Sequence, residues 1–219
     1  MEETTTPTSV PAIAVKPAVS DTLGLGWATL KKFFPELILI LFIVIIFSLP
    51  MGLVDAFFDK ESFGHMFFSI FNVFYGLIIM APLAYGARYL CLKAVRGEAF
   101  NVNEIFMAYR QTLQIALASL LVGVIVGIGI VLLIVPGIIF ACRLSMVPYL
   151  LMDRRLQAVD AVRQSWEITR GHAWSIFGLG FVSFWLAIAG LICLVVGIFP
   201  VIIWINLAFA AMYRGITEK

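Results

Sequence analysis

The stretch QTLQIALASLLVGVIVGIGIVLLIVPGIIFACRLSMVPYLLM, residues 111–152, decides the fold. It is 42 residues long, and Arg143 is its only charged residue. As one helix it would be about 60 Å long at 1.5 Å per residue. That is twice the roughly 30 Å hydrocarbon core of a bilayer. We therefore expect this stretch to cross the membrane twice. Pro136 and Gly137 are the expected turn, because proline ends a helix and glycine supplies a tight bend.

The other apolar runs extend this interpretation to the whole chain. Residues 37–54 and 66–87 carry no charge and predict one span each. Residues 173–213 form an uncharged run of 41 residues, which predicts two spans with a turn from Gly197 to Pro200. Because the runs are apolar all round and do not alternate with polar residues, we expect helices and no β-barrel. The expected spans are about 35–54, 66–88, 111–135, 137–152, 173–197 and 199–214.

The predicted fold class is therefore an all-α polytopic transmembrane helical bundle, with six spans arranged as three helical hairpins. Residues 21–219 form its single domain, and residues 1–20, rich in Thr, Pro and Ala, are expected to be a disordered cytoplasmic tail. The composition agrees, since 62% of the residues are hydrophobic and only 13% are charged. This excludes an ordinary soluble enzyme. A net charge of +2 also predicts no nucleic-acid partner.

The basic residues predict the orientation of the chain in the membrane. Fourteen of the 15 Lys and Arg residues fall on one side of the predicted spans, if Arg143 is counted there. Among them are Arg88, at the end of the second expected span, and Arg96, between the second and third spans. The other side carries Lys60 alone. Both termini are therefore expected to be cytoplasmic.

A short amphipathic segment precedes each predicted hairpin. The segments are DTLGLGWATLKKF (21–33), NVNEIFMAYRQ (101–111) and RRLQAVDAVRQSWEITRG (154–171). Their aromatic residues Trp27, Tyr109 and Trp166 are expected to anchor interfacial helices at headgroup depth. In the third segment Asp153 is the expected N-cap and Gly171 the expected stop. The layout is either a threefold repeat or the set of juxtamembrane stretches that any polytopic protein has.

Polar residues inside the predicted spans are the candidate sites. Arg143 would lie about 10 Å deep if the chain turned at Pro136, and a turn at residues 127–129 would bring it nearer the cytoplasmic face. There it would be either a site for an anion or a lipid headgroup, or a structural contact between helices. Asn72 and Asn206 are expected to form hydrogen bonds between helices. No sequence motif for catalysis, metal binding or cofactor binding is present, so we expect no catalytic residue, no metal and no cofactor.

Four stretches together resemble a known family. They are residues 89–98 (YLCLKAVRGE), 136–151 (PGIIFACRLSMVPYLL), 158–174 with its SWEIT core, and 211–214. Over roughly residues 20–216 the chain resembles bacterial six-helix membrane proteins related to the membrane domain of glycerophosphoryl diester phosphodiesterase, including the YciC-like group. The residues that match the family pattern are Pro136, Gly137, Arg143, Ser165, Trp166, Thr169 and Gly171.

This resemblance implies a six-helix bundle in the bacterial cytoplasmic (inner) membrane. The phosphodiesterase chemistry of fused members lies in a separate soluble domain, so hydrolysis is not expected here. We expect a non-enzymatic membrane protein of the cell envelope that acts through membrane lipids or a membrane-protein partner. The alternative is a transporter for a small solute or a lipid, with its site near Arg143.

The predicted topology can be tested with reporter fusions near Lys60, near Arg96, at Gly137 and at Lys219. The charge asymmetry predicts a cytoplasmic signal at Arg96 and Lys219 and a periplasmic signal at Lys60 and Gly137. A periplasmic signal at Arg96 or Lys219 would contradict the six-span arrangement.

Overall fold

The computed structural model describes residues 18–57, 63–192 and 195–218, and every regular element in these ranges is helical. This confirms the all-α fold class. The elements are α1 (Val19–Lys32), α2 (Phe34–Phe57), α3 (Phe63–Tyr75), the π-helical turn η1 (Gly76–Met80), α4 (Ala81–Arg96), the 3₁₀ helix η2 (Val102–Gln111), α5 (Thr112–Leu132), α6 (Ile134–Leu144), α7 (Val147–Asp153), α8 (Ala158–Ile168), α9 (Ala173–Ile192) and α10 (Val195–Thr217).

Within the described ranges, six helical stretches are long and apolar enough to cross a membrane, which agrees with the predicted number. They are Phe34–Met51, Ser69–Arg96, Val102–Leu132, Val135–Asp153, Ala173–Leu191 and Ile198–Thr217. Large apolar side chains on these stretches face outward. Val131 is 86% exposed and Trp174 is 85% exposed. Exposed apolar surfaces of this kind are unfavourable in water but compatible with contact to lipid tails.

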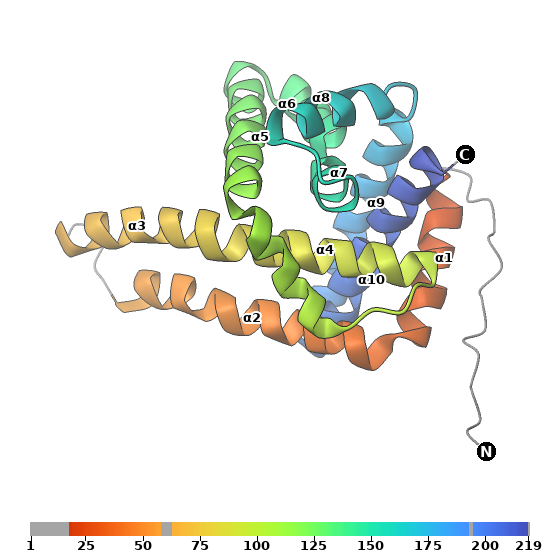
Figure 1. Ribbon diagram of the computed structural model, residues 1–219, viewed down its shortest axis with the longest axis horizontal. Helices are drawn as coiled ribbons and strands as arrows, with labels where there is room; N and C mark the ends of the chain where they lie inside the picture. Colours follow the sequence, from red (N-terminus) through yellow and green to blue (C-terminus); the bar gives the residue numbers. More distant parts are fainter. Residues whose placement is uncertain (1–17, 58–62, 193–194, 219) are drawn as a thin grey trace.

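The helices are not all parallel (Figure 1). α3, η1 and α4 follow one another as a long rod with α2 beside it, while α5 runs steeply across this rod. At the other end α1 packs along α10, where the Trp27 and Trp204 ring centroids are 5.0 Å apart. The indole N–H of Trp204 also donates to the carbonyl of Leu23 at 2.9 Å. The arrangement of the spans as three hairpins stays a prediction.

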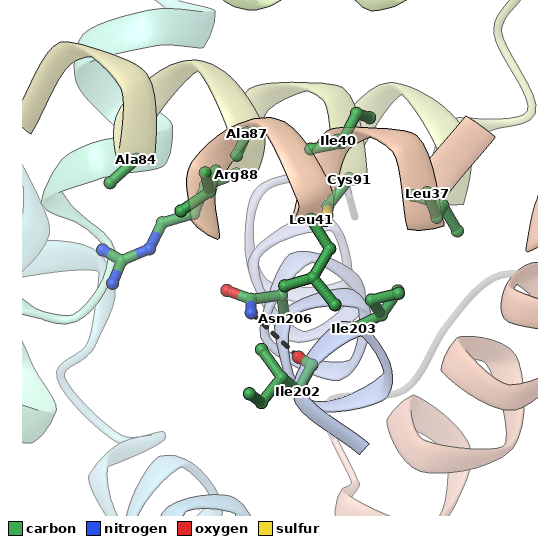
Figure 2. A pocket seen from close by; sticks show the side chains of 11 residues that line it. Leu37, Ile40, Leu41, Ala84, Ala87, Arg88, Cys91, Ile202, Ile203 and Asn206 are labelled. Carbon is green, nitrogen blue, oxygen red and sulfur yellow. Dashed lines mark hydrogen bonds between the residues drawn. The ribbon is translucent and has the colours of Figure 1, made fainter. Parts of the chain in front are cut away.

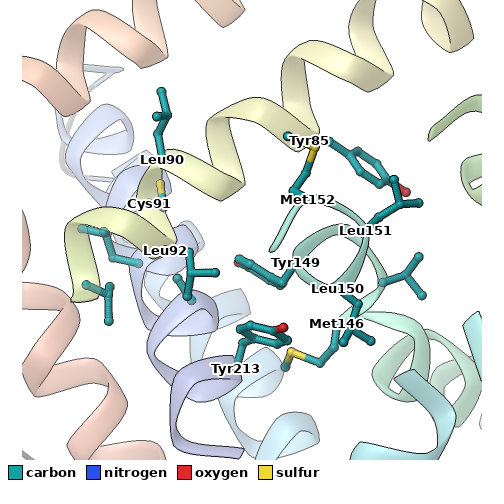
Figure 3. Packing of buried hydrophobic residues seen from close by; sticks show 14 of the residues in the cluster. Tyr85, Leu90, Cys91, Leu92, Met146, Tyr149, Leu150, Leu151, Met152 and Tyr213 are labelled. Atoms are coloured by element: carbon teal, nitrogen blue, oxygen red, sulfur yellow. The ribbon is translucent and has the colours of Figure 1, made fainter. Parts of the chain in front are cut away.

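The buried core lies where α4, α7 and α10 meet (Figure 3). The Tyr149 and Tyr213 rings stack there with centroids 5.3 Å apart. Around them α7 is almost wholly inaccessible, with Leu150 and Leu151 fully buried. The short α7 is therefore enclosed by protein. The buried side chains around it form the contact between α4, α7 and α10.

The π-helical turn in the rod is stabilised by a tyrosine from another helix. A π turn leaves backbone groups without their usual α-helical partners, and inside a membrane such groups need a partner from the protein. The Tyr109 hydroxyl donates to the carbonyl of Ile79, within this turn, at 2.9 Å. Tyr75, just before the turn, donates its hydroxyl to the carbonyl of Phe47 in α2 at 2.8 Å.

The predicted turn at Pro136 and Gly137 is wrong. The helical chain is interrupted at Leu133, which is extended with φ −163° and ψ 137°, and both residues lie in the first turns of α6. The reason is that the first N–H groups of a helix have no intrahelical partner, so proline near the start loses nothing. Gly137 instead permits close packing. A Cβ there would lie 2.7 Å from the Ile130 nitrogen.

The turn predicted at Gly197 to Pro200 is wrong for a similar reason. α9 ends at Ile192 and α10 begins at Val195, so both residues lie inside α10. Proline here removes only one early hydrogen bond of the helix, a loss that membrane helices tolerate. In the predicted tail, residues 1–17 lie outside the described residues, while Val19 and Ser20 already belong to α1.

The second predicted span, 66–88, ends at Arg88, but the helix extends beyond this residue. α4 continues to Arg96 and ends at Gly97, which adopts the left-handed conformation with φ 76°. Glycine in this conformation is a common helix terminator. Arg88 therefore lies inside the candidate span Ser69–Arg96.

The close approach of η2 to α4 generates a stability prediction. A Cβ at Gly86 would collide with the carbonyl oxygen of Ile105 and would lie 3.2 Å from its Cα. Because backbone cannot move aside cheaply, Gly86→Ala is expected to lower the unfolding free energy by about 1–3 kcal/mol. The measurement is thermal unfolding in one detergent. Gly123→Ala is the matched control, since nothing lies within 4 Å of a Cβ there. Equal melting temperatures for the two variants would contradict this packing.

Candidate functional site

Arg143 lies at the end of α6, against α8. It is ten residues beyond the interruption at Leu133, which is about 15 Å along a helix axis. Its guanidinium carbon sits 4.4 Å from the centroid of the Trp166 ring, a cation–π contact. Its Nε is buried and has no hydrogen-bond partner among the described residues. The side chain is thus held over the indole ring, while its Nε–H group remains without an acceptor among the described residues.

α8 also holds the backbone of Arg143. The Ser165 hydroxyl donates to the Arg143 carbonyl at 2.7 Å. The last carbonyls of a helix have no intrahelical partner, so this bond satisfies one that α6 leaves open. Thr169 donates to the Ser165 carbonyl at 2.8 Å. Both hydroxyl residues are fully buried. The resemblance singled out Arg143, Ser165, Trp166 and Thr169, and the structure brings these four together.

A groove of about 500 Å³ opens beside Arg143, between α6 and the start of α9. Its lining residues are Val135, Ile138, Ile139, Cys142, Arg143, Ala173, Trp174 and Phe177. Arg143 is the only charged one among these described residues. A mostly apolar groove with one fixed polar group is the usual form of a small-molecule site, and its volume lies within the usual range of about 300–1,000 Å³.

The other predicted polar residues lie away from Arg143. Asn72 is on α3. Asn206 is on α10, where its side-chain amide donates to the carbonyl of Ile202 at 2.9 Å. Asn206 lines a different pocket, next to Arg88. The three candidates of the sequence are therefore not one site.

Arg88 is the residue that sequence reasoning missed (Figure 2). It lines a pocket of about 220 Å³ between α2, α4 and α10, and its guanidinium points away from Leu37 and Ile40. A second pocket, of about 210 Å³, lies on its α7 side and includes Ser145 and Tyr149. The sequence did contain a signal for this position, namely the helix-terminating Gly97. A second span that continues to this glycine places Arg88 eight residues before its end, inside the span.

The predicted interfacial aromatics have contacts within the protein. Trp27 is partly exposed, contacts the tilted ring of Trp204 and has the Lys31 ammonium over its own ring at 5.2 Å. Tyr109 bonds the π turn, and Trp166 supports Arg143. Helices form in all three amphipathic segments as α1, η2 and α8. Their placement at a membrane interface stays a prediction.

A network of charged side chains joins the ends of α4, α7 and α10. Arg96 forms a two-point contact with Asp153, at 2.5 Å and 2.9 Å, and its Nε donates to Glu218 at 2.6 Å. The Tyr213 hydroxyl donates to Asp153 at 3.1 Å. Arg214 donates to Glu218 at 3.1 Å. The expectation that Asp153 caps α8 is wrong, because it ends α7 and Gln157 precedes α8.

Comparison with family models, with curated proteins and with solved structures finds no match to this chain. The assignment of a function therefore depends on the geometry above.

The charged network generates a second stability prediction. The Arg96 and Asp153 side chains are only 18% and 17% exposed, so removing one partner leaves a largely buried charge. Arg96→Gln is expected to lower the unfolding free energy by about 3 kcal/mol. Chemical unfolding in mixed micelles measures it. The control is Arg163→Gln, whose partner Glu167 is 3.6 Å away on an exposed surface, and which should change stability little. Equal effects of the two substitutions would show that the network is not a structural contact.

Proposed function

We propose that this protein is a non-enzymatic integral membrane protein that acts through lipid contacts. Its binding site is the groove between α6 and α9, and its ligand is an anionic membrane lipid. The phosphate lies at Arg143 and an acyl chain lies along the apolar wall. The setting we propose is the bacterial cytoplasmic membrane with both chain ends cytoplasmic, as the basic residues and the family resemblance predict.

The observation that carries this proposal is the unused capacity of the Arg143 guanidinium. It has five N–H donors and cannot lose its charge in a protein. Its buried Nε has no acceptor among the described residues, and Trp166 contacts only its face. A charge in an apolar setting needs an acceptor. A phosphate oxygen pair fits the planar fork of arginine in two-point geometry.

The surroundings of Arg143 support a lipid over a free anion. Ile138, Ile139 and Phe177 line the groove next to the cation, and hydrocarbon is the complement of such a wall. α8, which supports Arg143, is the clearest of the segments predicted to lie at the membrane interface. Lipid phosphates are found at that level, so the headgroup can reach the guanidinium without leaving its own layer.

The proposal is tested by identifying the lipids that copurify with the wild type, Arg143→Leu and Arg143→Lys in the same mild detergent. We expect anionic lipid to be enriched on the wild type. The enrichment should fall roughly tenfold in the leucine variant, which lacks the charge-assisted contact. It should fall less in the lysine variant, which keeps the charge and loses the fork. Arg163→Leu, on exposed α8 surface, is the control and should match the wild type.

Thermal unfolding of the same samples separates binding from a structural role. Retained stability with lost anionic lipid supports the site. An unchanged lipid profile in Arg143→Leu contradicts it, and if stability falls in that variant, Arg143 serves to fasten α6 to α8 through Trp166.

A further inference from the structure

Like Arg143, Arg88 lies in a candidate span and has no acceptor among the described residues. Its guanidinium forms no hydrogen bond and no ion pair with any described residue, although it is only partly buried. The other basic side chains of α4 are paired. Arg96 contacts Asp153, and Lys93 contacts Glu104 at 2.6 Å. Arg88 is therefore the one α4 cation left available to a ligand among these described residues.

The position of Arg88 makes an unpaired state costly. It lies eight residues before Arg96, about 12 Å along the helix axis from the charged network. Placing an arginine at the centre of a span costs roughly 2.5–3.5 kcal/mol on insertion scales, and arginine cannot escape by deprotonation. The side chain needs an acceptor that comes from outside the protein.

The space around Arg88 is mainly apolar. Leu37, Ile40 and Leu41 of α2 and Ile203 of α10 line the first pocket. Its polar lining is confined to Arg88 and Asn206, and Figure 2 shows these two side chains on the same side of it. The second pocket adds the Tyr149 hydroxyl, which donates to the Asn206 backbone carbonyl at 3.4 Å. A ligand here would place an acidic group at Arg88 and hydrocarbon between α2 and α10.

We infer that Arg88 binds the carboxylate of a single-chain amphiphile, of the fatty-acid class, in this pocket. A carboxylate matches the guanidinium in a two-point contact. Pockets of about 220 Å³ and 210 Å³ are below the usual range for larger ligands, which favours one chain over a two-chain lipid. A phospholipid would also have to bring its further headgroup substituents about 12 Å below the charged network. This site is separate from the Arg143 groove.

The test is equilibrium binding of palmitate to the purified full-length protein in a non-ionic detergent. We compare wild type with Arg88→Gln, which keeps the length of the side chain and removes its charge. The expected result is a Kd roughly tenfold or more higher in the variant, because one charge-assisted contact is lost. Hexadecanol, which has the chain without the carboxylate, should bind wild type with a similarly raised Kd. Arg163→Gln, which removes an exposed charge of α8, is the control and should bind palmitate as the wild type does.

A second variant guards against loss of the fold in Arg88→Gln. Ala84→Leu fills the first pocket and leaves the arginine in place, so palmitate affinity should fall while the melting temperature stays near that of wild type. Equal palmitate affinity in wild type, Arg88→Gln and Ala84→Leu overturns the inference. Displacement of palmitate by phosphatidylglycerol or by inorganic phosphate, if it depends on Arg88, also overturns it, because the ligand would then be a lipid phosphate or a free anion.

Discussion

A single carboxylate, that of Asp153, holds three helices at one point. It accepts two bonds from Arg96 of α4 and one from Tyr213 of α10 while ending α7. A largely buried ion pair adds little net stability over apolar packing, but it penalises any arrangement that separates the partners. The Tyr149–Tyr213 stack and the second pocket at Arg88 lie between the same helices, and α4 and α10 also line the first pocket. Their shape therefore depends on this contact.

Five of the basic residues fall into two groups according to their acceptors. Lys93, Arg96 and Arg214 have carboxylate partners near helix ends. Arg88 and Arg143 have none among the described residues, yet each borders an apolar pocket. An unpaired cation in an apolar setting is expensive, so it persists where something other than folding uses it. These are the two places where we propose that a ligand binds.

The helical class and the number of spans could be predicted because they depend on the length and uniform apolarity of each run. The turns could not. Pro136 and Pro200 break helices in general, but near a helix start they lose little, and only the fold shows where the start lies. Arg143 could be found as an isolated charge. Arg88 was missed as a residue inside a span because the end of the second span was predicted from the first charge after the apolar run. The Asp153 contacts could not be predicted because they join residues far apart in the sequence.

The π turn at Gly76–Met80 separates two halves of one rod that have different surroundings. A π turn contains one residue more than an α-helical turn, which rotates everything beyond it by about 100° around the axis. The apolar face of α3 is thereby set independently of the face that α4 buries against α7 and α10. Phe71 and Phe74 project outward on one half, while Leu83 and Leu90 are fully enclosed on the other. One extra residue thus lets a continuous helix serve both the bilayer and the protein interior.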